Sequence, residues 1–484
     1  MQADFQVAII GAGFGGLGMA IELKKRGRHS LVILEKADQV GGAWRDNTYP
    51  GAACDVPSHL YSFSFARKFD WSRRFAPQAE ILDYLKRCAR DHDLERHLRL
   101  GIEVRGARFD EDAGLWRMET DQGELTARAL ITATGQLNRP AWPRVPGLER
   151  FQGPVFHSAR WDHGVDLAGK TVAVVGTGAS AIQFVPEVAK QARQVKLFQR
   201  SAAYVIPKPD RPYSPLEQRL MARLPWLQTL DRARVYAQNE TRVLGFTALQ
   251  GVMKVYQWLF QRYLRRTVSD PALREKLTPD YPMGCKRILI SNDYFQAIER
   301  FDIEVRTGGV AAVDETGLED ADGQHHDADV LIFGTGFQAT DFLAPMTIQG
   351  RQGRDLNEAW RDGAEAYLGI TVHGFPNLFM LYGPNTNLGH NSIVYMLESQ
   401  IAYVLSALEE MERPGVGGLE VNAEVQDRFN RDIQTRLRDS VWGQGCDSWY
   451  KTESGKNTNN WPGFTFRYRR RTRRLDPRDY ELHP

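Results

Sequence analysis

Two short runs of glycine and other small residues have the spacing that binds a pyrophosphate. One contains Gly11, Gly13, Phe14, Gly15 and Gly16, and the other contains Gly176, Thr177, Gly178, Ser180 and Ala181. In such a run the first glycine permits a tight turn, the second lets the backbone approach the phosphates, and the last small residue allows close helix–strand packing. Free N–H groups at the start of the following helix bind the anion. Each run therefore predicts a contact site for a dinucleotide cofactor.

The elements around each run are those that must position it. Residues 6–10 form an apolar run of strand length, followed by a helical pattern over 17–27 and a second strand over 31–34. The second copy repeats this order, with strands over 171–175 and 195–198. A glycine run alone is weak evidence, because it also occurs as a simple strand–helix turn. With strand, helix and strand all in place, the nucleotide interpretation is favoured.

One position distinguishes the two cofactors. Glu35 follows Gly11 by 24 positions, and Arg200 follows Gly176 by the same 24. An acid there accepts hydrogen bonds from ribose hydroxyls, whereas a guanidinium suits a 2′-phosphate. We therefore expect the first lobe to bind the ADP half of FAD and the second to bind NADPH. Arg200 could instead be a solvated surface residue, and Lys286 or Ser201 could share its role.

The order of these patterns predicts an α/β fold with two Rossmann-like dinucleotide-binding domains and a helical insertion. Two apolar segments that end in small residues, 129–135 and 330–336, are typical of strands beneath a nucleotide. The expected FAD-binding domain comprises 1–145 and 340–484, and the NADPH-binding domain comprises 146–212 and 283–339. Helical periodicity marks 213–282 as an insertion over the active site. Its amphipathic face is expected to pack on the protein, with a membrane surface as the alternative.

Composition excludes several classes of partner. The 484 residues are 42% hydrophobic and 25% charged, and the net charge of +2 argues against nucleic acid as the principal partner. No stretch has the length needed to span a bilayer, and the beginning of the chain lacks a secretory pattern, so a cytoplasmic location is expected. The four cysteines, Cys54, Cys88, Cys285 and Cys446, form no CxxC pair. We therefore expect neither a disulfide framework nor a metal site, and the disulfide-reductase class is disfavoured.

The segment between the lobes narrows the chemistry. Phe151, Gly153, His157 and Trp161 stand at the spacing F-x-G-x-x-x-H-x-x-x-W, followed by an aspartate. This segment resembles the fingerprint of Baeyer–Villiger monooxygenases, whereas the related flavin-containing monooxygenases usually have Tyr or Phe at the tryptophan position. Residues 41–55 resemble a longer motif of the same family, GGxWxxxxYPGxxxD, at all its fixed positions.

The resemblance extends along nearly the whole chain. Residues 284–287 match the segment in which the family carries its active-site arginine, here Arg287, and Trp449 lies where the family has a mobile loop over the nicotinamide. There are departures as well. Ala53 stands where many cyclic-ketone enzymes have arginine, and Gly334 replaces the usual alanine of the second ATG motif. These departures leave the substrate open more than the reaction type.

The resemblance implies a soluble FAD- and NADPH-dependent monooxygenase that converts a ketone and dioxygen into an ester or lactone through a C4a-peroxyflavin, with side activity on sulfides. Arg287 would stabilise the peroxide and the tetrahedral adduct, and Asp55 would fix the guanidinium. His157 would help to position NADP without acting as a base. The plainer alternatives are an ordinary buried salt bridge for the pair, and simple hinge packing for His157 and Trp161.

Further residues are expected to contact the cofactors. Lys36 and Val104 should lie near the adenine of FAD, Trp44 and Tyr61 near the isoalloxazine, and Thr134 and Gly135 along the pyrophosphate or ribose. The remaining expected contacts are Gly42, Gln136, Gly336, Phe337, Met396 and Trp449.

Two rival classes share the two nucleotide lobes. A flavin-containing monooxygenase that oxidises nitrogen or sulfur would need no arginine at the peroxide, so Trp161 and the expected Asp55/Arg287 pair speak against it. An NADPH oxidase or reductase would release peroxide without an oxygenated product. The particular ketone and the oligomeric state are not specified by the sequence.

Overall fold

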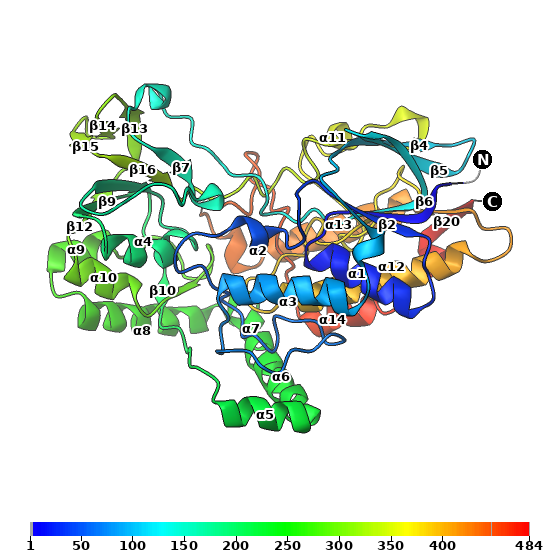
Figure 1. The fold of residues 1–484 in the computed structure, drawn as a ribbon, viewed down its shortest axis with the longest axis horizontal. Helices are drawn as coiled ribbons and strands as arrows, with labels where there is room; N and C mark the ends of the chain where they lie inside the picture. Colours follow the sequence, from blue (N-terminus) through cyan, green and yellow to red (C-terminus); the bar gives the residue numbers. More distant parts are fainter. Residues whose placement is uncertain (1–2, 447, 484) are drawn as a thin grey trace.

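The computed structural model describes residues 3–446 and 448–483, and Figure 1 shows two α/β lobes side by side. The first lobe is built on a sheet in the order β17-β4-β5-β6-β1-β2-β3, with β18 also paired to β6. Its strands are β1 (Phe5–Ile10), β2 (Leu31–Glu35), β3 (Leu98–Leu100), β4 (Val104–Asp110), β5 (Leu115–Thr120), β6 (Gly123–Thr132), β17 (Thr347–Gln349) and β18 (Leu378–Met380).

In this sheet, strand β6 pairs with strands that lie before and after the second lobe in the sequence. One edge of β6 pairs in parallel with β1. Along its other edge, β5 pairs with the first part of β6 in an antiparallel ladder, from Thr120 opposite Gly123 to Trp116 opposite Ala127. Beyond that point β18 takes over in parallel, with Leu378 opposite Leu130. The first sheet is therefore completed by a strand that lies after the second lobe in the sequence.

The helices of the first lobe cover the sheet and carry the segments that reach the other lobe. Helix α1 begins within the first glycine run, at Phe14, and contacts α3 and α12. The elements are α1 (Phe14–Lys25), α2 (Ala43–Asp46), α3 (Gln78–Asp91), α11 (Leu356–Ala359), α12 (Ile393–Met411), α13 (Ala423–Arg438) and α14 (Thr465–Arg471), with the antiparallel pair β19 (Gly418–Val421) and β20 (Tyr480–His483).

The second lobe has its own parallel sheet in the order β12-β9-β8-β16-β7. These elements are β7 (Val155–His157), β8 (Thr171–Val175), α4 (Ala181–Ala189), β9 (Gln194–Gln199), α10 (Tyr294–Arg300), β12 (Ile303–Thr307) and β16 (Val330–Phe333). An antiparallel unit of β13 (Val310–Val313), β14 (Gly317–Asp320) and β15 (His325–Asp327) extends it. The two segments predicted to end beneath a nucleotide thus fall in different sheets, one in β6 and the other in β16.

The insertion is helical, as its periodicity predicts. It contains α5 (Pro215–Arg223), α6 (Pro225–Glu240), α7 (Val243–Phe246), α8 (Gly251–Thr267) and α9 (Pro271–Lys276). A short parallel pair, β10 (Val205–Ile206) and β11 (Leu289–Ile290), closes its base. The expected packing of its amphipathic face on the protein holds only in part. Helix α8 buries Met253, Phe260 and Leu264, whereas α5 buries no residue.

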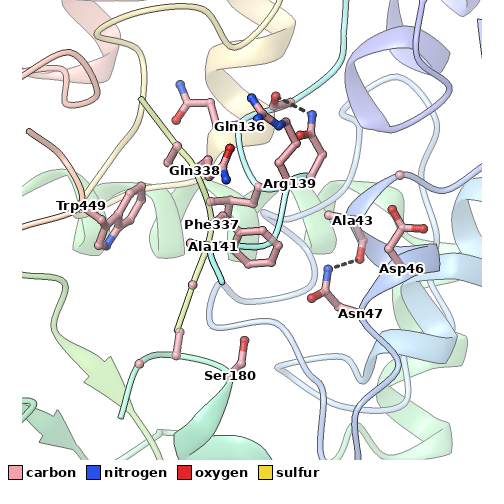
Figure 2. Close-up of a pocket in the computed structure, with 18 of the residues that line it drawn as sticks. Ala43, Asp46, Asn47, Gln136, Arg139, Ala141, Ser180, Phe337, Gln338 and Trp449 are labelled. Atoms are coloured by element: carbon pink, nitrogen blue, oxygen red, sulfur yellow. Dashed lines mark hydrogen bonds between the residues drawn. The ribbon is translucent and has the colours of Figure 1, made fainter. Parts of the chain in front are cut away.

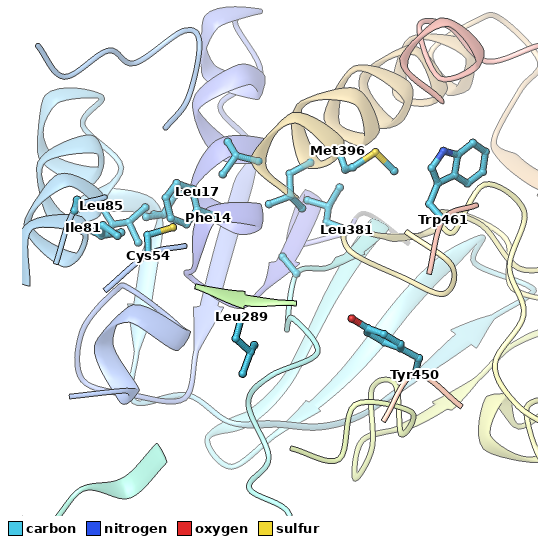
Figure 3. Packing of buried hydrophobic residues seen from close by; sticks show 14 of the residues in the cluster. Phe14, Leu17, Cys54, Ile81, Leu85, Leu289, Leu381, Met396, Tyr450 and Trp461 are labelled. Atoms are coloured by element: carbon cyan, nitrogen blue, oxygen red, sulfur yellow. The ribbon is translucent and has the colours of Figure 1, made fainter. Parts of the chain in front are cut away.

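A hydrophobic core runs continuously from one lobe into the other. Leu17 of α1 and Phe184 of α4 belong to one cluster, together with Leu289 and Tyr450. Figure 3 shows Cys54, Leu289, Leu381 and Tyr450 around one region of this cluster, contributed by segments far apart in the sequence. Because protein cores are closely packed, this shared cluster holds the facing surfaces of the two lobes together.

The first glycine run depends on a close backbone approach at Gly16. A Cβ atom there would lie 1.9 Å from the carbonyl oxygen of Gly11, which leaves no room for a side chain. We predict that Gly16→Ala lowers the free energy of unfolding by about 1–3 kcal/mol, the usual range for overpacking, and reduces bound flavin. Chemical denaturation and the flavin-to-protein absorbance ratio measure both effects.

Gly251→Ala is the matched control for this substitution. Nothing lies within 4 Å of a Cβ at Gly251, which is exposed at the start of α8, so this variant should be as stable as the parent or more stable by up to about 1 kcal/mol. Equal stability of the Gly16→Ala variant would contradict the close packing of the run.

Candidate active site

A cavity of ≈ 1220 Å³ lies between the two lobes and is lined by both glycine runs. Figure 2 shows Phe337 and Gln338 at its centre, with Trp449 on one side, Asp46 and Asn47 on the other, and Ser180 below them. Most residues predicted to contact a cofactor line this cavity: Gly11, Gly13, Phe14, Gly15, Glu35, Lys36, Gly42, Trp44, Tyr61, Val104, Thr134, Gly135, Gln136, Gly176, Thr177, Gly178, Ser180, Arg200, Ser201, Lys286, Gly336, Phe337 and Trp449.

At one end of the cavity, Glu35 closes strand β2 beside the first glycine run. Its carboxylate accepts hydrogen bonds from the backbone N–H groups of Ala12 (2.9 Å) and Ala37 (3.0 Å) and from Arg45 Nη1 (3.0 Å). A carboxylate has about four lone-pair positions, so one acceptor position is left for a ribose hydroxyl. This arrangement fits the expectation that Glu35 binds the ribose of FAD.

At the other end, Arg200 directly follows strand β9 and is exposed at the cavity wall. Lys286 donates a hydrogen bond to Ser201 (Nζ···Oγ 2.9 Å) and lies 4.5 Å from the ring centroid of Tyr281. Thr177 in turn donates to the backbone oxygen of Ser201 (3.2 Å). Two cations and a hydroxyl therefore converge beside the second glycine run, as a 2′-phosphate requires.

Gln136 tests whether the lining of the cavity suits a bound dinucleotide. Its side chain is 5% exposed and donates through Nε2 to the backbone oxygen of Tyr382 (3.2 Å), while its Oε1 has no hydrogen-bond partner among the described residues. A buried acceptor without a partner is costly, and Gln136 lines the cavity. A bound group that donates a hydrogen bond here would satisfy it, so the cavity fits the polar dinucleotides that the sequence predicts.

Asp55 and Arg287 meet across the lobes in an ion pair between Oδ2 and Nη2. Both line the cavity, with 26% and 36% of their side chains exposed. The negative charge of Asp55 raises the pKa of Arg287 further above its ordinary high value, and Tyr450 and Tyr382 act in the same direction. The guanidinium is therefore a permanent positive charge at the centre of the site.

The segment before Asp55 is held against α4 of the second lobe. Gln183 accepts from the hydroxyl of Tyr49 (3.1 Å) and from the backbone N–H of Ala53 (3.3 Å), and it donates to the carbonyl of Ala53 (3.0 Å). Gly51 has φ +79°, and a Cβ there would lie 2.6 Å from the backbone oxygen of Gln183. A larger residue would push the segment away from α4, so this glycine is what allows Asp55 to reach Arg287.

Aromatic side chains line the first lobe's part of the cavity. Trp44 donates to the hydroxyl of Tyr61 (3.1 Å), and the ring of Phe14 packs edge-on against Tyr61 at 5.2 Å. Trp449 lies on the opposite side with 36% of its surface exposed, and its ring centroid is 4.4 Å from that of Tyr450. These residues form an apolar part of the cavity wall.

Five predicted residues do not line the cavity. Gly16, His157, Trp161, Ala181 and Met396 lie behind its wall. His157 is fully buried, its ring centroid 5.6 Å from that of Trp142 and 6.1 Å from that of Phe337, and burial lowers its pKa to about 4. It is therefore neutral near pH 7 and supports two cavity-lining rings. Trp161 likewise packs on Phe184 at 5.3 Å.

The structure corrects the expectation for the cysteines. Cys285 and Cys446 form a disulfide, with Cα atoms 6.3 Å apart and 161 positions between them in the sequence. Cys54 and Cys88 are buried free thiols. The missed disulfide connects the segment that carries Arg287 to the segment that leads to Trp449. Such a pairing has no local spacing motif, so only the fold reveals it.

Sequence reasoning also missed several polar residues of the cavity. Arg45 holds Glu35, Gln183 holds Ala53, and Tyr382 carries a positive φ of 65° beside the site. The other missed polar residues of the lining include Asp46, Asn47, Asn138, Arg139, Gln338, Asn387 and Asn391. Two of them, Asn138 and Arg139, lie two and three positions after the predicted contact residue Gln136, and that proximity is the signal that could have identified them.

The two nucleotide lobes share one cavity, which has an aromatic wall and a permanent cation. These features define a flavoprotein of the two-dinucleotide class. The family model described as "Pyridine nucleotide-disulphide oxidoreductase" matches residues 8–243. A Baeyer–Villiger monooxygenase of Pseudomonas aeruginosa is 50% identical over 99% of this chain and 91% of its own length. One from Streptomyces coelicolor is 44% identical over 99% and 92%.

Solved structures give the same result. A structure of OTEMO in complex with FAD and NADP has a TM-score of 0.91 at 26% identity and covers 100% of both chains. Oxidised steroid monooxygenase bound to NADP has a TM-score of 0.88 at 31% identity over 99% of both chains. The chain belongs to the Baeyer–Villiger monooxygenases, and it is an NADPH-dependent flavin monooxygenase. The predicted family, fold class and cofactors are thereby confirmed.

The disulfide makes a direct prediction for cysteine labelling. When the protein is unfolded without reductant, iodoacetamide should modify two cysteines, Cys54 and Cys88, and after reduction it should modify all four. Intact mass spectrometry counts the added groups. In the control variant Cys285→Ser, Cys446 loses its partner and should be modified without reduction. Four modified cysteines in the unreduced parent protein would show that the bond does not form.

Proposed function

We propose that this chain carries out the Baeyer–Villiger oxidation of an organic ketone, and that Arg287, held by Asp55, is the catalytic cation. The observation that carries the assignment of Arg287 is the position of the ion pair. It lies in the wall of a cavity lined by both glycine runs, where the reactive ends of two dinucleotides would meet. Bound FAD supplies the reaction with dioxygen, and NADPH supplies the electrons.

The residues of the first lobe hold and orient the flavin. Glu35 accepts from the ribose, Gln136 offers its free Oε1 to a donor, and Trp44 and Tyr61 form an apolar surface beside the ring system. Arg200, Ser201 and Lys286 hold the phosphate of NADPH. Fixing both cofactors and the ketone in one cavity replaces encounters in solution by reaction within one complex.

Arg287 stabilises negative charge on the reacting oxygen and then on the former carbonyl oxygen of the ketone. A guanidinium suits this task because it stays protonated and presents several donors in a fixed plane. Asp55 fixes the orientation of that plane, and without it the side chain would be free to turn toward solvent. The surrounding aromatic residues keep the local dielectric low, which strengthens the stabilisation of charge.

The identity of the oxygenated product tests this proposal. The holoenzyme is incubated with NADPH, ¹⁸O₂ and linear, cyclic and aryl ketones, with a sulfide alongside. Labelled ester or lactone supports the oxidation of ketones, and labelled sulfoxide in addition would establish a side activity on sulfides. Sulfoxide alone would assign the protein to heteroatom oxidation, and hydrogen peroxide alone would assign it to the oxidase class.

Arg287→Ala tests the role of the cation. The variant should still have its flavin bleached by NADPH under anaerobic conditions, whereas ester formation should fall by about 10²–10³-fold, as for the loss of an oxyanion donor. Stopped-flow absorbance follows the first step and product analysis the second. Arg300→Ala, which removes an exposed arginine at the end of α10, is the control and should keep both rates. Normal ester formation by Arg287→Ala would refute the assignment.

Arg200→Ala tests the assignment of the second nucleotide site. Loss of a charge-assisted contact with the 2′-phosphate should raise KM for NADPH by about 10- to 100-fold and leave KM for NADH nearly unchanged. Steady-state oxidation of each cofactor measures the two values, and flavin content confirms that the first lobe is intact. An equal change for both cofactors would remove the argument that Arg200 recognises the phosphate.

A further inference from the structure

The helical insertion exposes large apolar side chains that its own fold does not cover. On α5, on α6 and at the residue between them these are Leu216 (65% exposed), Leu220, Leu224, Trp226 (60%) and Leu230 (61%). Figure 1 shows that α5 and α6 project from the body of the molecule and that α8 runs along the same lower side. Apolar residues gathered in this way mark an interaction surface, whereas single exposed ones do not.

Helix α8 carries a second apolar face in addition to the one that packs on the protein. The buried face contains Met253, Phe260 and Leu264. The exposed face has the spacing i, i+3, i+4, i+7 and consists of Val252, Val255, Tyr256 and Leu259. Residues so spaced share one side of a helix, and here that side lies apart from the buried one. Trp258 is exposed next to it. A helix that only covered the active site would not need a second, exposed apolar face.

The acidic side chains of these helices already have partners within the chain. Glu217 caps the start of α5 and binds Arg211 (Oε1···Nη2 2.8 Å). Asp231 pairs with the buried His59 (Oδ2···Nδ1 2.7 Å). Glu240 is 5% exposed and accepts from Asn391 (2.7 Å). These three are the acidic residues of 215–267. Asp231 also lies 3.9 Å from Nε of Arg234, so Arg234 is the one basic residue of the outer surface that an acid of this range pairs with among the ion pairs of the described residues.

The basic side chains of the same helices face outward. Residues 215–267 contain nine lysines and arginines against the three acids, although the whole chain has a net charge of only +2. The exposed ones on α5, α6 and α8 are Arg219, Arg223, Arg234, Lys254, Arg262, Arg265 and Arg266. We call the exposed apolar residues of α5, α6 and α8, together with these seven, the basic apolar surface.

We propose that the basic apolar surface docks the enzyme on an anionic lipid bilayer. Leucine, valine and tryptophan would enter the region between headgroups and acyl chains, while the long basic side chains reach outward to lipid phosphates. Among the described residues no helix is long and apolar enough to cross a membrane, so attachment is peripheral. A second copy fits this surface poorly, because a symmetric contact would bring the same positive charges together.

Attachment at this surface has a consequence for the reaction. Met253, on the inner face of α8, contacts the position of a Cβ at Gly284, three residues before Arg287. The outer face of the same helix would then rest on the lipid. An apolar ketone that partitions into a bilayer would be concentrated next to the lobe that carries the catalytic cation. This step depends on the proposed function, whereas the lipid binding itself does not.

Co-sedimentation of the flavin-loaded enzyme with lipid vesicles tests the proposal. We expect binding to vesicles of phosphatidylcholine mixed with phosphatidylglycerol, weaker binding to phosphatidylcholine alone, and a loss of binding as salt is raised. Trp226→Gln combined with Leu230→Gln removes apolar anchors but keeps good helix formers, and Arg262→Glu combined with Arg266→Glu reverses two charges. Each pair should weaken binding by about tenfold or more.

Leu482→Gln, at a similarly exposed leucine of β20 in the first lobe, is the matched control and should bind as the parent does. Flavin content and ketone oxidation in detergent-free buffer show that each variant is folded, independently of lipid. Absence of binding to the anionic vesicles, or equal binding by both double variants and the parent, would overturn the proposal. A dimer in light scattering that dissociates in the Trp226→Gln/Leu230→Gln variant would assign the surface to a second copy and would also overturn it.

Discussion

Asp55 and Arg287 come from different lobes, and their charges meet in the wall of the cavity that the two lobes share. The charges lie in a partly exposed wall with aromatic neighbours, where separating them would leave each with little compensation. The position of the pair therefore has to be held by the surrounding chain. The contacts between the 41–55 segment and α4 provide this support. The carboxylate of Asp55 can reach the guanidinium of Arg287 only when that segment lies close to α4.

The supporting contacts use different kinds of interaction at the same junction. Gln183 binds the backbone of Ala53 in both directions, and Gly51 allows the two backbones to approach. The Cys285–Cys446 disulfide anchors the other partner, since it lies two residues before Arg287. Hydrogen bonds, backbone geometry and a covalent bond thus restrain one guanidinium from both sides. Such restraint is what allows a fixed charge to stabilise a transition state without costly rearrangement.

Local pattern was sufficient to predict the nucleotide lobes. The strand predicted over 171–175 has these bounds as β8, Glu35 ends β2, and Arg200 directly follows β9. These features depend on neighbours in the sequence, where glycine spacing and apolar periodicity are informative. The family resemblance likewise identified Asp55 and Arg287, and both residues line the cavity. The distance between the two residues along the sequence does not by itself predict that they are in contact.

The features that sequence did not predict depend on contacts between distant segments. The disulfide joins residues 161 positions apart, and the hydrogen bonds of Gln183 involve a helix of the other lobe. Periodicity identified the helices of the insertion, but it cannot tell which apolar face is covered. The motif residue His157 and the expected contact Met396 illustrate the same limit, because both are buried and neither lines the cavity.

The pairing of β6 also determines the order in which the protein can form during synthesis. The second lobe is a continuous stretch of chain from β7 to β16, so all its sheet strands have left the ribosome before β18 is made. The first sheet lacks its partner along the end of β6 until residues 378–380 emerge. The inserted lobe can therefore fold first as a unit, while the lobe that begins the chain is completed last.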